Sequence, residues 1–331
     1  MRVIVAGATG LVGSEMLKVL EERWPAGTMD LIPVASERSA GREVFFSGKH
    51  VRVVTMEEAL GLGAEAALFS AGSAFSWEWG PRLAEKGVRV IDNSSAWRMD
   101  PGVPLVVPEI NPMDLKKDHF LIANPNCSTI QMLMALKPLH DAWGLEEVVV
   151  STYQAVTGTG RKALQQLEDE RMARSCASPA YPYPIDLNLI PQVDVFLDNG
   201  YTKEELKMRQ ESQKILHLPV LRVSATCVRV PITGGHSESI AATFRQDVSV
   251  EEARLLLGRM PGVSLLDEPE KRVYPMPLYC RGKNEVFVGR LRRDPDHSRR
   301  LHFWVVADNL RKGAATNAVQ ILEFIRAQGW I

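Results

Sequence analysis

The sequence has few cysteines, and they lie far apart. Its 331 residues include 4, at Cys127, Cys176, Cys227 and Cys280. None forms a CxxC pair, which excludes a zinc knuckle and gives no support to a disulfide framework. Thiols that stay reduced are typical of the cytoplasm. We therefore expect a cytoplasmic protein without a metal site.

The sequence also lacks an excess of charge of one sign and a long apolar run. Lys and Arg total 39, Asp and Glu total 40, and the formal net charge is −1. This balance excludes a protein that binds nucleic acid through bulk positive charge, as well as an acidic disordered tail. The longest stretch without Asp, Glu, Lys or Arg, residues 119–136, contains two asparagines and a glutamine and is too polar to span a membrane. The apolar run at the start of the chain is too short for a signal sequence.

The first part of the chain alternates between strand and helix patterns, and the length suits about two domains. Short runs rich in Val and Ile predict strands, and apolar residues at helical spacing predict helices. Strands are predicted at residues 3–6, 31–35, 64–70 and 88–91, and helices at 14–23 and 79–86. This order is typical of an α/β domain with a parallel, doubly wound sheet.

The pattern changes after residue 126. Helices are predicted at residues 128–143, 201–216 and 314–327, and Thr202 with Glu205 forms a capping box in the second. Strands are predicted at residues 147–155, 220–231, 239–245, 286–291 and 301–307, and an irregular surface segment at 178–193. This part predicts an α+β domain with a mixed or antiparallel sheet.

A glycine-rich turn separates the first predicted strand from the first predicted helix. Gly7, Gly10 and Gly13 follow the spacing GxxGxxG rather than GxGxxG. Small residues let the backbone approach a pyrophosphate, and the helix N-terminus supplies N–H donors and positive potential. The motif predicts dinucleotide binding, with a tight turn that binds no ligand as the alternative.

A polar loop follows the second predicted strand and reads Ser36-Glu37-Arg38-Ser39. A 2′-phosphate needs arginine and hydroxyl partners, whereas an NAD ribose usually meets a carboxylate. Arg38 between serines favours NADP. Glu37 would suit NAD, and a solvated loop without a ligand is a further alternative.

One cysteine lies at the start of a predicted helix. Cys127 follows Asn124-Pro125-Asn126 and precedes Ser128. A helix N-terminus lowers a thiol pKa and favours the thiolate, which nucleophilic catalysis requires. The polar neighbours argue against burial in an apolar core. The other three cysteines are interpreted as structural.

Several fragments occur in the order found in one enzyme family. They are GATGLVG, DNSSAWRMD, NPNCST, YQAVTGTG, EELKM, RVPITGGHSES and DNLRKGAA. The chain resembles bacterial aspartate-semialdehyde dehydrogenase over essentially its whole length. The resemblance implies a Rossmann-like dinucleotide-binding domain (residues 1–126 plus 310–331), a catalytic and dimerisation domain (residues 127–309), and a homodimer.

The resemblance implies a reaction of amino-acid biosynthesis. L-4-aspartyl phosphate is reduced by NADPH to L-aspartate 4-semialdehyde, reversibly and with release of phosphate, on the route to lysine through diaminopimelate and to threonine, methionine and isoleucine. Cys127 matches the nucleophile that forms the acyl thioester. His236 matches the acid/base, because an imidazole titrates near neutral pH. It follows two glycines and is expected in a flexible loop. Gln154 matches the residue that orients the substrate.

The resemblance also implies two groups of ligands for the substrates. Arg229 matches the residue that binds the α-carboxylate through its planar fork, and Glu204 matches the partner of the α-ammonium. Lys207, Arg98 and Asn93 match phosphate-binding positions. Glu204 and Lys207 are three residues apart and share one helix face. Without the resemblance, both would be interpreted as ordinary exposed residues.

The expected cofactor is NADP, and its matching positions lie in several segments. These positions are Gly7, Thr9, Gly10, Leu11, Val12, Gly13, Ser36, Arg38, Ser39, Thr157, Gly158 and Asn309. Many relatives read Ser-Gly-Ala-Gly where this chain reads Thr157-Gly158-Thr159-Gly160. The hydroxyl is kept, so the departure is mild.

Three other functions are weighed against this one. N-acetyl-γ-glutamyl-phosphate reductase has the same architecture and chemistry, but Asn126 before Cys127 and the carboxylate of Glu204 argue against it. Glyceraldehyde-3-phosphate dehydrogenase expects Ser-Cys-Thr-Thr-Asn, which is absent. A non-catalytic dinucleotide-binding paralogue would lack the cysteine, histidine or arginine, and all three are present.

Overall fold

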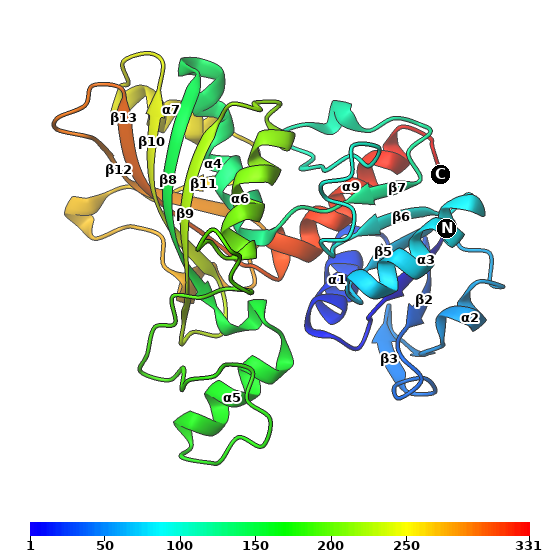
Figure 1. Ribbon diagram of the computed structural model, residues 1–331. Helices are drawn as coiled ribbons and strands as arrows, with labels where there is room; N and C mark the ends of the chain where they lie inside the picture. The colour runs from blue at the N-terminus through cyan, green and yellow to red at the C-terminus, as the bar shows by residue number, and fades with distance from the viewer. The chain divides into compact units, whose positions relative to one another are not determined.

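The computed structural model describes residues 1–331, which form two compact units (Figure 1). The first unit comprises Met1–Asn126 and Ala314–Ile331, and the second comprises Cys127–Gly313. The last helix of the chain therefore belongs to the first unit. No helix is long and apolar enough to cross a membrane.

A five-stranded sheet forms the centre of the first unit, in the order β2-β1-β5-β6-β7. All neighbouring strands are parallel, which confirms the predicted doubly wound α/β architecture. The strands are β1 (Arg2–Ala6), β2 (Asp30–Val34), β5 (Ala66–Phe69), β6 (Arg89–Asp92) and β7 (Leu121–Ala123). A separate hairpin consists of β3 (Glu43–Phe46) and β4 (Lys49–Arg52).

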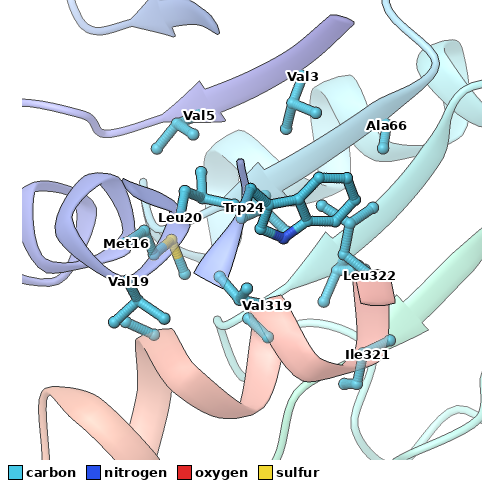
Figure 2. Close-up of a cluster of buried hydrophobic side chains, with 14 of the residues drawn as sticks. Val3, Val5, Met16, Val19, Leu20, Trp24, Ala66, Val319, Ile321 and Leu322 are labelled. Atoms are coloured by element: carbon cyan, nitrogen blue, oxygen red, sulfur yellow. The ribbon is translucent and has the colours of Figure 1, made fainter. Parts of the chain in front are cut away.

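Helices cover both faces of this sheet. They are α1 (Leu11–Arg23), α2 (Met56–Ala59), α3 (Ser73–Glu85) and α9 (Thr316–Ala327). Successive residues of a strand point to opposite faces. Val3 and Val5 accordingly pack with residues of α1 and α9, such as Leu20 and Leu322 (Figure 2). Ile4 and Ala6 belong to the other cluster, which contains residues of α2 and α3.

A six-stranded mixed sheet forms the centre of the second unit, in the order β11-β12-β13-β10-β8-β9. The β8–β9 and β11–β12 pairs are parallel and the others are antiparallel, which confirms the predicted mixed sheet. The strands are β8 (Leu145–Ala155), β9 (Arg222–Val230), β10 (His236–Phe244), β11 (Val263–Leu265), β12 (Val286–Arg293) and β13 (Arg300–Ala307).

Three helices pack on one face of this sheet, where α4 contacts both α6 and α7. They are α4 (Cys127–Trp143), α6 (Lys203–Ile215) and α7 (Val250–Arg259). The predicted capping box of Thr202 and Glu205 is present at the start of α6. Val148 and Val150 of β8 are fully buried towards these helices, whereas Val149, which points the other way, is 49% exposed. The second face of the sheet is therefore exposed around Val149, whereas Phe287 and Val306 on the same face are buried against Cys280.

The remaining elements are short. They are α5 (Arg161–Arg171), α8 (Pro277–Cys280), 3₁₀ turns at Pro112–Asp114, Val156–Gly158 and Pro269–Lys271, and one π-helical turn at Arg311–Ala315 before α9.

Several predicted elements differ from the observed ones. α1 and α3 begin at Leu11 and Ser73, earlier than predicted, because Gly10 and Gly72 turn the chain directly into a helix. Sequence patterns did not predict the β3–β4 hairpin, β7, α5 or α7. Residues 178–193 are irregular as predicted, but they do not lie only on the surface. Tyr181 and Ile185 are buried against Leu167 of α5.

Candidate active site

In the first unit, the glycine-rich turn leads from β1 into α1 and depends on glycine for steric reasons. Gly7 has φ +81°, and a Cβ there would lie 2.3 Å from the carbonyl oxygen of Ser70. A Cβ on Gly13 would lie 2.0 Å from the carbonyl oxygen of Gly7. Glycine thus lets the end of β1 and the start of α1 pack closely, and a helix N-terminus in this position can bind an anion.

A hollow of about 710 Å³ lies beside this turn. Of the predicted cofactor residues, it is lined by Gly7, Thr9, Gly10, Ser36 and Arg38. Leu11, Val12 and Gly13 form the first turn of α1 and do not line the hollow, nor does Ser39. Sequence analysis missed several residues that also line the hollow, among them Thr55, Met56, Ser70, Ala71, Phe75 and Trp79.

The hollow suits an adenine dinucleotide with a charged group at one end. The aromatic rings of Phe75 and Trp79 supply an apolar wall, and Arg38 with Ser36 supplies a cation and a hydroxyl. Glu37 lines the same hollow, so both residues on which the choice between NADP and NAD depends are present.

A hydrogen-bond network holds the polar segment after β6. Asp92 is fully buried and accepts bonds from the Ser76 hydroxyl (2.8 Å) and the Ser94 hydroxyl (2.6 Å). Burial raises the pKa of Asp92, and the bonds from Ser94 and Ser76 oppose this rise. Arg98 donates from Nη2 to the carbonyl oxygen of Asn93 at 2.9 Å. The structure thus brings Asn93 and Arg98 together, as the prediction of a phosphate site requires.

Three asparagines join α9 to this segment. Asn317 Nδ2 donates to Asn124 Oδ1 at 2.7 Å, and Asn124 Nδ2 donates to Asn93 Oδ1 at 2.6 Å. Asn317 is fully buried and was not identified from the sequence. This chain of amides fixes the side chain of Asn93 and the segment that leads to residue 127.

In the second unit, Cys127 is the first residue of α4. Its thiol lies at the end of the helix where the dipole favours negative charge. A Cβ on Gly313 would lie 2.8 Å from the Cys127 Cβ, so only glycine fits next to this residue. Cys127 is half-buried, whereas Cys227 and Cys280 are buried. Burial raises the pKa of Cys280 to about 11 and raises that of Cys227 further, so neither thiol ionises near neutral pH.

His236 is the first residue of β10 and is fully buried, so its predicted place in a flexible loop is wrong. Strand pairing with β8 and β13 begins directly after the two glycines and orders the residue. The Ala155 N–H donates to His236 Nδ1 at 3.1 Å. A nitrogen that accepts carries no proton, so this bond favours the tautomer with the imidazole proton on Nε2. Burial, followed by the charge of Arg229, holds the pKa of His236 well below its usual 6.5.

Arg229 approaches the same peptide from β9. It is 4% exposed, and its Nη1 donates to the carbonyl oxygen of Ala155 at 2.7 Å. Neither Arg229 Nε nor His236 Nε2 has a hydrogen-bond partner. Gly158 lies beside both groups, because a Cβ there would be 2.7 Å from Arg229 Nη1 and 3.2 Å from His236 Nε2. Two buried N–H donors without partners, next to a glycine that has no side chain, could bind a ligand rich in oxygen atoms.

Gln154 links the elements around this site. Its Nε2 lies 3.1 Å from Ser128 Oγ on α4 and 3.3 Å from Glu204 Oε1 on α6. Glu204 is 5% exposed, so the interpretation as an ordinary surface glutamate is wrong. The same unit also brings Thr157 and Asn309 together, with Thr157 Oγ1 at 3.2 Å from Asn309 Oδ1.

Asp194 contacts the predicted site residue Lys207 and was not identified from the sequence. Lys207 Nζ donates to Asp194 Oδ2 at 2.7 Å and to Glu204 Oε2 at 3.3 Å. Burial raises the pKa of Asp194, but the hydrogen bond and charge of Lys207 outweigh it and leave the pKa below its usual value. Asp194 belongs to the irregular segment before α6, and no spacing rule connects it to Lys207.

Comparisons with known proteins agree along the whole chain. Residues 2–118 match the family model described as "Semialdehyde dehydrogenase, NAD binding domain", and residues 136–312 match "Semialdehyde dehydrogenase, dimerisation domain". An aspartate-semialdehyde dehydrogenase from Aquifex aeolicus is 52% identical, covering 100% of this chain and 99% of that protein. The one from Bacillus subtilis is 48% identical, covering 98% and 97%. The chain belongs to the aspartate-semialdehyde dehydrogenase family.

Solved structures of aspartate-semialdehyde dehydrogenases agree with this membership. The crystal structure of aspartate semialdehyde dehydrogenase II from Vibrio cholerae has a TM-score of 0.93 and 45% identity, covering 98% of each chain. A second structure of that enzyme, complexed with ASA, matches equally well. The predicted family, the two-part fold, the oxidoreductase activity in amino-acid biosynthesis and the use of a nicotinamide dinucleotide are confirmed.

Proposed function

We propose that this chain catalyses the NADP-dependent, reversible conversion of L-4-aspartyl phosphate to L-aspartate 4-semialdehyde and phosphate through a thioester on Cys127. The observation that carries the proposal is the geometry of the second unit. There, Cys127 begins a helix, and two buried donors without partners, on His236 and Arg229, lie beside Gly158. The first unit is proposed as the dinucleotide-binding domain and the second as the catalytic and dimerisation domain.

Cys127 is the proposed nucleophile. Its thiolate attacks the acyl carbon, a C–S bond forms, and phosphate leaves with the electron pair of the C–O bond. When bound, NADPH supplies the hydride that converts the thioester into a thiohemiacetal oxyanion. Collapse of that oxyanion expels the Cys127 thiolate and yields the aldehyde, and the departed phosphate takes up the proton that balances the reaction. The placement of the sulfur at a helix N-terminus supports both its attack and its departure.

His236 is proposed to stabilise the oxygen of the acyl group. With Nδ1 held by Ala155, Nε2–H is a fixed donor that can stabilise the negative charge of the oxyanion. Proton exchange with the thiol or the thiohemiacetal oxygen, the role implied by the resemblance, stays a second prediction for His236. The lowered pKa of His236 also favours the neutral ring.

The substrate's charged groups have proposed partners. Arg229 is proposed to bind the α-carboxylate and Glu204 the α-ammonium, with Gln154 orienting the acyl group between them. Lys207, Arg98 and Asn93 are proposed as phosphate ligands. The burial of Glu204 and its bond to Gln154 support this assignment, because a buried carboxylate needs cationic or N–H partners.

NADP is the proposed form of the cofactor. The glycine turn and the hollow beside it fit a dinucleotide, because side chains at Gly7 and Gly13 would collide with the backbone. Arg38 and Ser36 are proposed to bind the 2′-phosphate, and Thr9, Gly10, Leu11 and Val12 the pyrophosphate through the start of α1. Thr157, Gly158 and Asn309 are proposed to contact the nicotinamide.

A cytoplasmic homodimer is the proposed assembly. The match to a dimerisation domain supports it, as does the exposed part of the second face of the six-stranded sheet, where Val149 is 49% exposed. All four cysteines are free, which agrees with a reducing compartment. No nucleic acid or membrane partner is proposed.

The test is an assay of the purified chain with L-aspartate 4-semialdehyde, phosphate and NADP⁺, monitored by NADPH absorbance. We expect activity that depends on phosphate and is greater with NADP⁺ than with NAD⁺. N-acetyl-L-glutamate 5-semialdehyde serves as the competing substrate. Preference for that compound would replace this proposal with the reductase of the N-acetylated substrate.

A further inference from the structure

Glu238 is a buried carboxyl group that the proposed reaction does not use. It lies on β10, two residues from His236, and is 0% exposed. Residues two apart on a strand point to the same face, so Glu238 shares the helix-covered face with His236. Neither of its carboxyl oxygens has a hydrogen-bond partner. A buried polar group without a partner in a native structure calls for an explanation.

Gln131 of α4 lies beside Glu238 and also has a buried polar atom without a partner. This side chain is 1% exposed, contacts Glu238, and has no partner for its Oε1. Its Nε2 lies 3.4 Å from the carbonyl oxygen of His236. Gln131 also lies one helical turn after Cys127, on the same face of α4. Gln131 Oε1 and a carboxylate are both acceptors, so a hydrogen bond can join these two groups only when the carboxyl group carries the proton.

No cation is among the causes of the pKa shift of Glu238, which are its burial and the side chain of Gln131. α4 carries no charged side chain between Cys127 and Lys137. The residues paired with Glu238 are Thr152 of β8 and Val305 of β13.

The nearby titratable groups lie on β9, α6 and β10. Cys227 of β9, Glu204 and Glu205 of α6, and His236 are neutral or acidic, and Arg229 donates to Ala155 instead. Burial holds the pKa of Glu238 well above its usual value, and contact with Gln131 offsets only part of this rise. An isolated buried charge is far more costly than the neutral acid.

We propose that Glu238 is a positioning residue that, as a neutral acid, donates a hydrogen bond to Gln131 Oε1. That bond turns the amide NH₂ of Gln131 towards the carbonyl oxygen of His236. It thereby fixes the first residue of β10, whose imidazole must present Nε2 to the acyl group. A neutral Glu238 also leaves the imidazole uncharged, because an anion on this face would stabilise the imidazolium. This inference rests on the proposed role of His236.

The test compares Glu238→Gln with Glu238→Leu and Gln131→Leu. Glutamine keeps both the shape and a donor, so Glu238→Gln should retain kcat to within about twofold. Glu238→Leu removes the donor and should lower kcat on the order of tenfold with little change in the KM for NADP⁺, as expected for a displaced catalytic group. Gln131→Leu should reproduce that loss, and the double Leu variant should add nothing to it.

Ile240→Ala is the matched control. Ile240 is 1% exposed and lies on the same face of β10, two residues beyond Glu238. Its truncation should lower the thermal midpoint and leave kcat nearly unchanged. A loss in Glu238→Gln as large as in Glu238→Leu, or additive losses in the double variant, would overturn the proposal.

Infrared spectroscopy tests the proton without relying on activity. The carbonyl stretch of a protonated carboxylic acid should be present in the wild type at pH 8, disappear in Glu238→Gln and shift in Gln131→Leu. Absence of that band would refute the neutral Glu238 even in an active enzyme. If the protein lacked the proposed activity but showed the band, the proposed function would be wrong. The hydrogen bond between Glu238 and Gln131 would still be supported.

Discussion

At the scale of the residue, Cys127 differs from the other cysteines in its surroundings. The thiols of Cys227 and Cys280 are held protonated by burial, whereas Cys127 occupies a helix N-terminus. Cys127→Ser should abolish turnover and leave the thermal midpoint nearly unchanged, because a serine hydroxyl does not ionise near neutral pH. NADPH formation and thermal unfolding measure the two effects. Cys176→Ser is the control and should keep full activity. Near-normal turnover of Cys127→Ser would show that Cys127 is not the nucleophile.

Gly158 offers a second test at this scale. A Cβ at this position would approach Arg229 Nη1 and His236 Nε2, yet the residue itself is exposed and has ordinary backbone geometry. Gly158→Ala should therefore lower kcat/KM for the semialdehyde about tenfold or more while the fold survives.

Gly258→Ala, in open space on α7, is the control for Gly158→Ala. It should keep activity and raise the free energy of unfolding by about 0.5–1 kcal/mol. Steady-state kinetics and urea unfolding measure both variants. Equal activity of the two would show that the space beside Arg229 is not used.

Arg38 is the residue on which the choice of cofactor depends. A charge-assisted bond to phosphate contributes roughly 1.5–3 kcal/mol, so Arg38→Ala should raise the KM for NADP⁺ about tenfold or more relative to that for NAD⁺. Initial rates with each cofactor give the ratio. Arg42→Ala, in the same exposed segment but outside the hollow, should leave it unchanged. An equal effect on both cofactors would exclude contact with the 2′-phosphate.

At the scale of the element, the exposed part of the second face of the six-stranded sheet is the proposed dimer surface. Ala241 of β10 lies at its centre, between Val149 of β8 and His302 of β13. Ala241→Glu should convert the dimer to a monomer, because a charge buried in an interface without a partner is strongly unfavourable. Light scattering after size-exclusion chromatography measures the mass. Leu255→Glu, exposed on α7, should leave the mass unchanged. The same result from both variants would place the interface elsewhere.

At the scale of the whole molecule, two buried groups make stability depend on pH in opposite directions. The pKa of Glu238 is raised in the folded state, so the unfolded chain releases a proton first as pH rises above its usual 4.5. Glu238 therefore contributes to the free energy of unfolding below pH 4.5, and this contribution is lost as the pH rises above that value. The pKa of His236 is lowered, so the unfolded chain takes up a proton first as pH falls below 6.5, and stability is lost there.

Glu238→Gln should remove the first of these effects. Between pH 5 and pH 8 the wild type should lose unfolding free energy relative to this variant, with a limiting slope of about 1.4 kcal/mol per pH unit for one proton. Urea unfolding of both proteins across this range measures the difference. A constant difference with pH would mean that Glu238 ionises equally in both states.

Local patterns in the sequence determined most of the elements and the chemistry of the nucleophile. Period-two and helical spacing indicated the strands and helices, because those periods follow from backbone geometry alone. The Thr202–Glu205 capping box and the helix start at Cys127 are equally local. The order of the motifs was enough to indicate the family, and the glycine spacing was enough to predict a dinucleotide turn.

Only the tertiary structure decided what lies around these residues. Burial of Glu204, the bond from Lys207 to Asp194, the tautomer of His236 and the contact between Gln131 and Glu238 each join segments distant in sequence. No local pattern encodes the desolvation or the hydrogen-bond partner of a side chain, since both depend on which strands and helices pack against it. For that reason Glu204, which the sequence alone suggested to be exposed, is buried beside Gln154. His236, which was expected in a loop, is the first residue of a strand.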